Sequence, residues 1–434
     1  MTVRTPRNGV HGGRPPWTPR EADSRFAAQV LDRLDLDRAV DLVRQVCRIP
    51  SVLGQEGDLA AFLAEVMREA GFESVALEPV LPERPNAVGE VGLGAGPRVV
   101  LTGHMDTKPE SHGWRVASPF SGDLIDGAVY GHGVMDMKAA LACQIVAIEA
   151  VRATGLPLSG TLAMAAVCDH MGDQTGSRAY FDAHPPADLC VLGELTDNEV
   201  CLGHRGRYYF DVVVRGRSAH TCHKHAAVNA NVLAAQAVLA LDRSRLEPRL
   251  DDGVAELFGK ETYIVPGRIY GGLAPGGPSM IPDECVIRVD CRPQPGVTTD
   301  QVRAEIERCL AEAEAADPRF AADVELVDVK SGYLARAADE VVRLMTSAVR
   351  LIKGSEPALV TENWLGDTAS FGADVPTVIF GPGGPPVYCA DEHLPVGDIH
   401  LAAKAYAVFA ALALADHKDG SADVAEAMQG SHER

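Results

Sequence analysis

Hydrophobic positions in the first part of the chain follow two different periods. Apolar residues recur at helical spacing in VDLVRQVCRIP (residues 40–50) and DLAAFLAEVMREAGF (58–72), and they form short continuous runs in PRVVLTGH (97–104) and TLAMAAVCD (161–169). Short apolar runs bounded by turn residues are typical of buried strands. Helices and strands in alternation indicate βα units, so we expect residues 25–205 to form a mainly parallel α/β sheet flanked by helices.

Residues 206–325 carry a different pattern. A strand with alternating polarity is predicted in YYFDVVVRG (208–216), followed by a helix in VNANVLAAQAVLAL (228–241). A second strand and a second helix are predicted in ECVIRVDCR (284–292) and TDQVRAEIERCLAEAEA (299–315). Two strand–helix pairs in a segment of this length are typical of a small α+β domain.

The α/β pattern resumes over residues 326–417. It comprises the helical segment VVRLMTSAVRLI (341–352), the strand-like segment PTVIFGPGG (376–384) and a last helix, HLAAKAYAVFAALALADH (400–417). We therefore expect one α/β domain, built from two parts of the chain and interrupted by an inserted α+β domain.

The two ends of the chain carry neither pattern. Residues 1–24 are rich in Arg, Pro and Gly and lack the apolar core of a signal peptide, which predicts a disordered leader. Residues 418–434 are polar and predict a flexible tail. The sequence has no uninterrupted apolar run of about 18 residues, which argues against a membrane span. These features predict a soluble protein of the cytoplasm.

Composition narrows the possible partners. A net charge of −20 over 434 residues would repel phosphate backbones and anionic membrane surfaces, so neither nucleic acid nor membrane is an expected partner. The 10 cysteines form no CxxC pairs and have no regular spacing. This argues against a zinc knuckle and against a disulfide framework, and it predicts reduced cysteines in the core.

Potential metal ligands follow three predicted strands and one glycine-rich turn. They are His104 and Asp106, Asp169 and His170, Glu194, and Asp136 after the turn. Because the carboxyl ends of parallel strands meet at one edge of a sheet, these side chains are expected to converge there. Histidine with carboxylates suits Zn²⁺, Mn²⁺ or Co²⁺. Asp106 shares a strand face with His104 and would orient it rather than bind metal. Such a site activates water for amide hydrolysis.

Each of these residues also has a structural interpretation when taken alone. A histidine at a strand end is commonly a hydrogen-bonded surface residue, and Asp136 before a helix is an N-cap candidate. Convergence of several polar strand ends in one domain favours the metal site.

Several motifs together resemble a known family, the co-catalytic zinc aminoacylases and exopeptidases. This family includes carboxypeptidase G, succinyl-diaminopimelate desuccinylase and acetylornithine deacetylase. The resemblance spans roughly residues 35–415, with the motifs in the family's order. The motifs are LTGHMDTKP (101–109), VYGHGVMDMKAA (129–140), LGELTD (192–197), RGRSAHT (215–221), IPDECVIRVDCR (281–292) and FGPGG (380–384).

The resemblance implies a catalytic domain with an inserted lid that dimerises. It also implies a metal ion held by His104, Asp136 and Glu194, with Asp136 bridging to a second ion and Asp106 orienting His104. Zinc would be the metal, with manganese or cobalt as alternatives.

The same resemblance assigns two residues of the lid. His220 would stabilise the oxyanion in an active site, commonly that of the partner subunit, and Arg292 would bind a substrate carboxylate. Three histidines, His220, His223 and His225, could also suggest a separate metal site, but the family position needs only the first.

The chain departs from the family at its second metal site. The family segment Glu-Glu-x-Gly is replaced by DHMG, which puts Asp169 at the position of the general base and His170 at that of a ligand. At the C-terminal motif Tyr388 stands where the family has a histidine ligand, and Cys389 or His393 nearby could contribute instead. The sequence therefore allows one ion or two.

These observations predict a homodimeric, metal-dependent amidohydrolase that acts on a small substrate with a carboxylate, such as an N-acyl-amino acid or a dipeptide. Two alternatives stay open because of the altered second site. One is an enzyme for acyl transfer, lyase or condensation chemistry, and the other is a binding protein that has lost hydrolysis.

Overall fold

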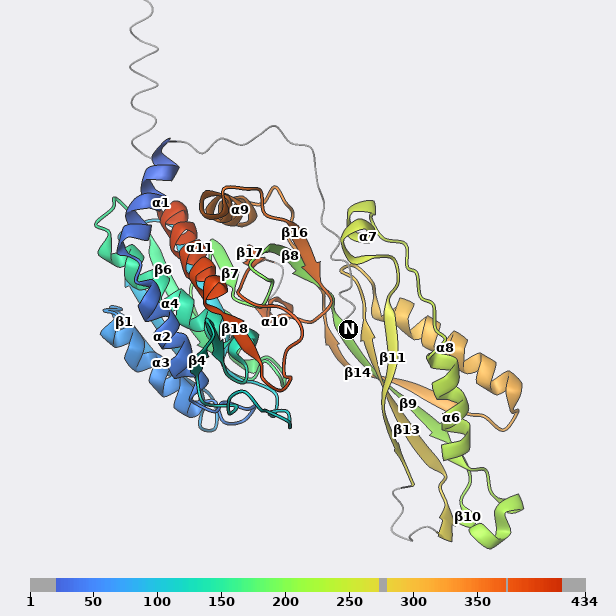
Figure 1. Ribbon diagram of the computed structural model, residues 1–434. Helices are drawn as coiled ribbons and strands as arrows, with labels where there is room; N and C mark the ends of the chain where they lie inside the picture. The colour runs from blue at the N-terminus through green and yellow to red at the C-terminus, as the bar shows by residue number, and fades with distance from the viewer. Residues whose placement is uncertain (1–20, 273–278, 372–373, 416–434) are drawn as a thin grey trace, which may run out of the picture. The chain divides into compact units, whose positions relative to one another are not determined.

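The structure is a computed structural model that describes residues 21–272, 279–371 and 374–415 (Figure 1). These residues form two compact units. The small unit comprises residues 203–334 and 360–369, and the large unit comprises residues 21–202, 335–359 and 370–415. The expected leader and tail lie mostly outside the described residues, although a first helix already begins at Glu21.

The large unit is built on a twisted sheet whose strands follow the order β1-β2-β6-β3-β7-β17-β8. The strands are β1 (Ser74–Leu81), β2 (Arg84–Gly92), β3 (Arg98–His104), β6 (Thr161–Val167), β7 (Leu189–Leu192), β8 (Val200–His204) and β17 (Thr377–Ile379). The central strands β6, β3, β7 and β17 pair in parallel, and the strands on either side are antiparallel. The last two residues of β8 belong to the small unit, and β15 (Tyr333–Leu334) of that unit pairs with them. A further strand, β16 (Leu359–Glu362), also pairs with β8.

Helices cover this sheet. They are α1 (Glu21–Arg33), α2 (Leu36–Cys47), α3 (Gly57–Glu69), α4 (Ala139–Ala153), α5 (Thr175–Ala183), α9 (Glu340–Lys353), α10 (Thr368–Phe371, at the boundary of the two units) and α11 (Val396–Leu414). α4 packs along α11, and α1 and α2 lie beside this pair (Figure 1). α11 is long and apolar enough to cross a membrane, but 61% of its most apolar window is buried inside the protein, as in the core helix of a globular domain.

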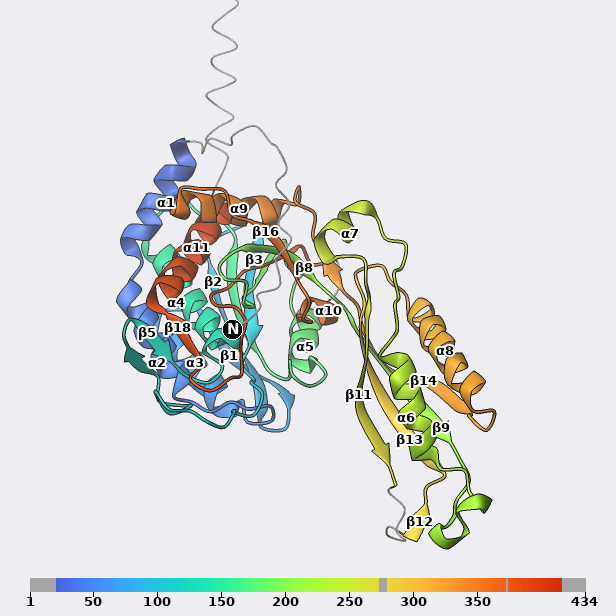
Figure 2. The same ribbon diagram turned by 45° about the vertical axis from the view of Figure 1, so that its right-hand side comes forward.

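The small unit is a four-stranded antiparallel sheet with helices packed on it. Its strands follow the order β11 (Tyr263–Gly271), β13 (Glu284–Arg292), β9 (Arg207–Arg215) and β14 (Ala322–Lys330). Helices α6 (Ala230–Leu241) and α8 (Thr299–Ala316) lie along the same face of the sheet in both views (Figures 1 and 2). α8 begins at a capping box, in which the Thr298 and Gln301 side chains each accept a hydrogen bond from the other residue's main-chain N–H. A single apolar core joins the helices to the sheet.

Shorter elements complete the two units. The large unit has a three-stranded sheet of β4 (Asp123–Ile125), β5 (Ala128–Tyr130) and β18 (His393–Pro395), and a short turn of helix, η1 (Val134–Lys138). The small unit has the pair β10 (Ala219–His220) and β12 (Met280–Ile281), the short helix η2 (Thr221–Ala226) and the helix α7 (Asp252–Phe258).

The predicted α/β fold class is confirmed, and three of the strands that sequence analysis missed have few buried residues. β11 and β14 are the edges of the small sheet, and most of their side chains are exposed or half-buried. An edge strand with so few buried positions gives little apolar periodicity to detect. The hairpin of β1 and β2 was missed for the same reason at β1, where no residue is buried.

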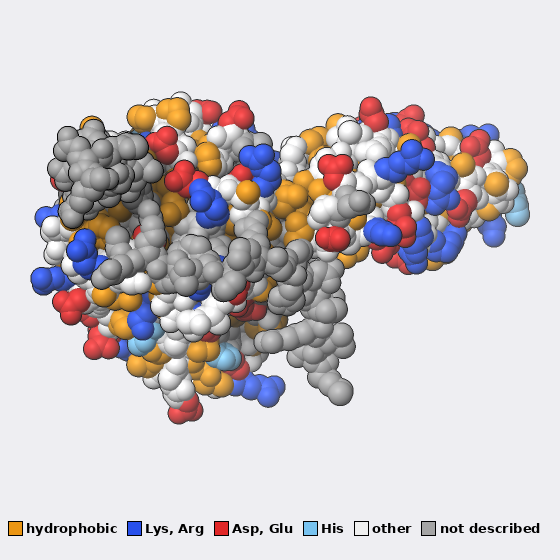
Figure 3. Space-filling view, turned by 90° about the horizontal axis from the view of Figure 1, so that it is seen from above, with side chains coloured by type: hydrophobic (Ala, Val, Ile, Leu, Met, Phe, Trp, Pro, Cys, Tyr) orange, Lys and Arg blue, Asp and Glu red, His pale blue; other side chains and the backbone are white. Residues whose placement is uncertain are grey.

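The surface carries both signs of charge. Figure 3 shows Lys and Arg side chains interspersed with Asp and Glu across the face that it draws.

Helix α6 offers a matched test of this packing. Leu233 is 1% exposed in the core of the small unit, whereas Leu239 on the same helix is 61% exposed. Because a buried leucine leaves a cavity, Leu233→Ala is expected to lower the free energy of unfolding by about 2–5 kcal/mol. Leu239→Ala is expected to change it by no more than about 0.5 kcal/mol. Urea denaturation measures both, and equal losses would contradict the packing.

Candidate active site

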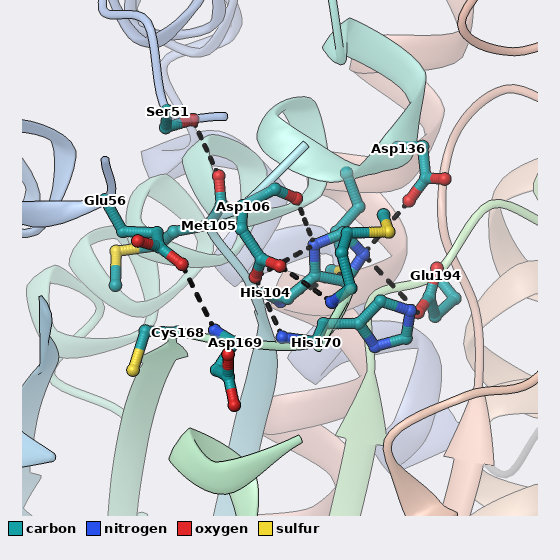
Figure 4. Close-up of polar contacts among 12 residues, drawn as sticks. Ser51, Glu56, His104, Met105, Asp106, Asp136, Cys168, Asp169, His170 and Glu194 are labelled. Atoms are coloured by element: carbon teal, nitrogen blue, oxygen red, sulfur yellow. Dashed lines mark hydrogen bonds and ion pairs between the residues drawn. The ribbon is translucent and has the colours of Figure 1, made fainter. Parts of the chain in front are cut away.

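Parallel pairing brings three strand ends to one edge of the large sheet. His104 ends β3 directly opposite Val167, the last residue of β6, and β7 ends at Leu192. The residues that follow β6 and β7 therefore reach the space beside His104. The ligand atoms of His104, His170 and Glu194 all lie within 4.8 Å of one another (Figure 4).

The imidazole of His104 is held in the orientation that a metal ligand needs. Its Nδ1 donates a hydrogen bond to the main-chain carbonyl oxygen of Asp106 at 2.8 Å. Nε2 is hydrogen-bonded to the Asp136 carboxylate at 3.0 Å and lies 3.6 Å from the Glu194 carboxylate. Nε2 is therefore the ring nitrogen that would bind a metal ion in place of a proton. The ring is completely buried, which fixes this orientation.

His170 faces the same point. Its Nε2 lies 3.9 Å from Oε1 of Glu194, and its ring stacks on that of His104 with centroids 4.1 Å apart. Metal–ligand bonds of about 2.0–2.2 Å in a tetrahedral site would put ligand atoms roughly 3.4 Å apart. The separations of 3.0, 3.6 and 3.9 Å lie on both sides of this value. The donor set therefore fits one divalent cation.

Negative charge dominates this group. Burial lowers the pKa of His104, but the carboxylates of Glu194 and Asp136 outweigh it and raise that pKa to about 10. Asp136 and Glu194 are only 8% and 2% exposed, so water screens them poorly. The negative potential that raises the pKa of His104 would also stabilise a bound cation.

A buried carboxylate shapes the loop that carries Asp136. Glu392 accepts hydrogen bonds from the main-chain N–H groups of Gly133, Met135 and Tyr388, at 3.1–3.2 Å. Gly133 has φ +72°, and a Cβ there would lie 2.4 Å from the Thr107 side chain, so this turn of the YGHG motif requires glycine. Burial raises the pKa of Glu392 to about 7. Asp136 itself is not helical and does not cap α4.

Asp106 acts on the site in two ways. Its main-chain carbonyl, rather than its carboxylate, orients His104, because the nearest carboxylate oxygen is 4.0 Å from Nδ1. The carboxylate instead accepts hydrogen bonds from the main-chain N–H groups of His170 and Met171, at 3.0 and 2.7 Å. Asp106 therefore links His104 to the segment that carries His170.

The carboxylate of Asp169 is engaged elsewhere. It accepts hydrogen bonds from Arg84 at 2.8 Å and from the Thr175 hydroxyl at 2.7 Å, and Arg84 also binds buried Glu56. Burial acts to raise the pKa of Asp169, but the hydrogen bonds from Thr175 and Arg84 lower it. In Figure 4 this carboxylate points away from His104, His170 and Glu194. No motif in the sequence pointed to Glu56 or Arg84.

Of the three C-terminal candidates, the structure brings Tyr388 to the cluster. The Tyr388 hydroxyl lies 3.9 Å from the sulfur of Met171 and interacts with the Asp136 carboxylate. Cys389 contacts the main chain of Pro386. His393 binds the main-chain carbonyl of Asp391 and stacks on Tyr130. Among the described residues, neither of these two belongs to the group of converging ligand atoms.

The other two predicted residues belong to the small unit. His220 is exposed at the end of β10, and its Nδ1 accepts a hydrogen bond from the Cys222 main chain at 3.2 Å. Arg292 ends β13 and forms a forked ion pair with Asp290, at 2.8 and 2.9 Å. His220, His223 and His225 do not form a ligand cluster within the part of the chain that the structure describes.

Comparison with known proteins decides the family. Residues 100–412 match the sequence profile of peptidase family M20/M25/M40, which is more than half of the chain. The chain belongs to this family. The resemblance found in the sequence is thereby confirmed. Membership of peptidase family M20/M25/M40 makes the chain a hydrolase of C–N bonds that depends on a divalent metal ion.

Two family members illustrate the similarity in sequence. A succinyl-diaminopimelate desuccinylase from Methylobacterium radiotolerans is 29% identical over 380 residues, which cover 84% of this chain and 93% of that protein. A second succinyl-diaminopimelate desuccinylase, from Methylocella silvestris, is 29% identical over 386 residues, which cover 85% of this chain and 96% of that protein.

Solved structures show the same fold at lower identity. The di-peptidase Dug1p from Saccharomyces cerevisiae superposes with a TM-score of 0.72 at 15% identity, over 91% of this chain and 100% of that chain. The metallo-carboxypeptidase Sso-CP2 from Sulfolobus solfataricus superposes with a TM-score of 0.72 at 16% identity, over 86% of this chain and 99% of that chain.

Proposed function

We propose that this protein is a metal-dependent amidohydrolase that cleaves the amide bond of a small substrate bearing a carboxylate, such as an N-acyl-amino acid or a dipeptide. The observation that carries the proposal is the convergence of His104, His170 and Glu194 at the carboxyl ends of parallel strands. The names of its relatives support the substrate class, since they are desuccinylases and a di-peptidase.

Zinc is the proposed metal, with manganese and cobalt as alternatives. Two imidazoles and two carboxylates, from His104, His170, Asp136 and Glu194, are a donor set that suits these ions. A bound ion would polarise the scissile carbonyl and lower the pKa of the attacking water. Asp106 fixes the two histidines relative to each other through its carbonyl and its carboxylate.

The remaining roles come from the family positions. Asp169 is the proposed general base, His220 the proposed donor to the oxyanion, and Arg292 the proposed partner of the substrate carboxylate. The forked pair of Arg292 with Asp290 shows that its guanidinium can present two parallel N–H groups to a carboxylate. We also propose a homodimer in the cytoplasm. Exposed apolar side chains on the edge strands, such as Ile269 and Val327, support dimerisation through the small unit.

Metal analysis and turnover test the proposed function together. The purified protein is expected to contain a divalent metal, to lose activity on chelation, and to regain it with Zn²⁺, Mn²⁺ or Co²⁺. The substrates are a panel of N-acyl-amino acids and dipeptides in ¹⁸O-labelled water. Label in the product carboxylate indicates hydrolysis. Turnover without label would mean that the acyl group goes to another acceptor, and protein without metal or turnover would contradict the proposal.

The base is tested by Asp169→Asn. A general base is worth about 100-fold or more in turnover, so kcat should fall by that amount while metal content stays the same. Asp182→Asn, at an exposed position of α5, is the matched control and should change neither kcat nor the melting temperature. If Asp169 only holds Arg84 and Thr175, the variant would instead lower the melting temperature and keep its kcat, which would rule out the base.

The role of His220 is tested by His220→Ala, which should lower turnover by about 100-fold. His223→Ala and His225→Ala, in the same exposed segment, are controls and should leave turnover close to that of the parent protein. Near-normal turnover of His220→Ala would reject the role. If His220 serves the partner subunit, mixing inactive His220→Ala and Glu194→Ala chains should restore about a quarter of the activity, because half of randomly formed dimers are mixed and hold one intact site.

A further inference from the structure

We infer that this centre holds a single divalent ion, and that the hydroxyl of Tyr388 takes the position beside Asp136 where a two-ion centre would hold its second ion. The inference rests on the proposed function for the first ion. It concerns the residues at which the chain departs from its family, His170 and Tyr388.

The first observation is the position of the Tyr388 hydroxyl. It lies 3.9 Å from the sulfur of Met171, the neighbour of His170, and it interacts with the Asp136 carboxylate. A second ion would have to lie between Asp136, which would bridge to it, and the segment of residues 170–171. The phenol hydroxyl lies near both of these groups. It is polar, and it brings no charge.

The second observation is that the backbone is arranged to place this phenol. Tyr388 has φ +57°, a left-handed conformation that is unusual for a bulky side chain. Its N–H donates to Glu392 at 3.2 Å, and the same carboxylate binds the loop that precedes Asp136. One buried residue therefore sets the position of both members of the Tyr388–Asp136 pair.

The third observation is the direction of His170. Its Nε2 lies 3.9 Å from Glu194, and its ring stacks on that of His104, so its ligand atom joins the group around the first ion. A histidine in this direction adds a ligand to the first ion instead of supporting a second one.

Charge leads to the same conclusion. Two neutral imidazoles and the carboxylates of Asp136 and Glu194 balance the two positive charges of one divalent ion. A second ion would leave an excess of two positive charges in a buried site. Three further carboxylates lie nearby, but each is already bound. Asp106 is held by two main-chain N–H groups, Asp169 by Arg84 and Thr175, and Glu392 by three main-chain N–H groups.

The experiment measures bound metal directly, by elemental analysis and by titration of metal-free protein with Zn²⁺ and Co²⁺. The parent protein is expected to saturate at one ion per chain. Tyr388→Phe should also bind one ion, but with an affinity about 10-fold lower, because Asp136 loses the hydroxyl that orients it. The visible spectrum of the Co²⁺ form should change in the same variant. Tyr209→Phe, in the small unit, is the matched control and should change neither quantity.

A double variant tests the claim from the other direction. His170→Glu with Tyr388→His restores the family's ligands and one negative charge, and the folded variant should bind two ions per chain. Two ions in the parent protein, an unchanged affinity in Tyr388→Phe, or a single ion in the folded double variant would each overturn the inference. Failure of the proposed function is distinguishable, because the parent protein would then bind no ion at this site.

Discussion

Two buried carboxylates, those of Asp136 and Glu194, set the main constraint on this structure. They lie 3.0 and 3.6 Å from the same atom, Nε2 of His104, at the edge of a sheet where water is largely excluded. Burying a charge without a partner costs several kcal/mol, so a positive charge must be supplied inside the protein. The ring nitrogens of His104 and His170 face these carboxylates, but an imidazole has no permanent positive charge. A divalent cation satisfies this arrangement, and the catalytic proposal follows from it.

Further carboxylates hold the loops that surround this centre. Asp106, Asp169 and Glu392 each accept main-chain N–H groups of a segment that carries a candidate ligand or its neighbour. These hydrogen bonds fix loops that no helix or strand would otherwise hold in place. Chemistry at such a centre needs atoms placed within fractions of an ångström, and buried hydrogen bonds of this kind provide that precision. The strong negative charge of the region therefore positions these loops, and it suits a divalent cation.

Much of this arrangement could be predicted from the sequence because it depends on residues that are close together in the chain. Short apolar runs indicated β3, β6 and β7, and the residues after them gave His104, His170 and Glu194. Contacts between distant residues could not be read in this way. Arg84 lies 85 positions before its partner Asp169, and neither Arg84 nor Glu56 belongs to a motif. The pairing of Tyr388 with Asp136 likewise depends on how two loops meet, which periodicity does not report.

The account is tested most directly by anomalous X-ray diffraction at the zinc absorption edge, from crystals of the full chain grown with zinc. It predicts one anomalous peak per chain, at bonding distances of about 2.0–2.2 Å from Nε2 of His104, Nε2 of His170 and carboxylate oxygens of Glu194 and Asp136. Absence of a peak among these four residues, with zinc bound elsewhere on the chain, would contradict the central claim.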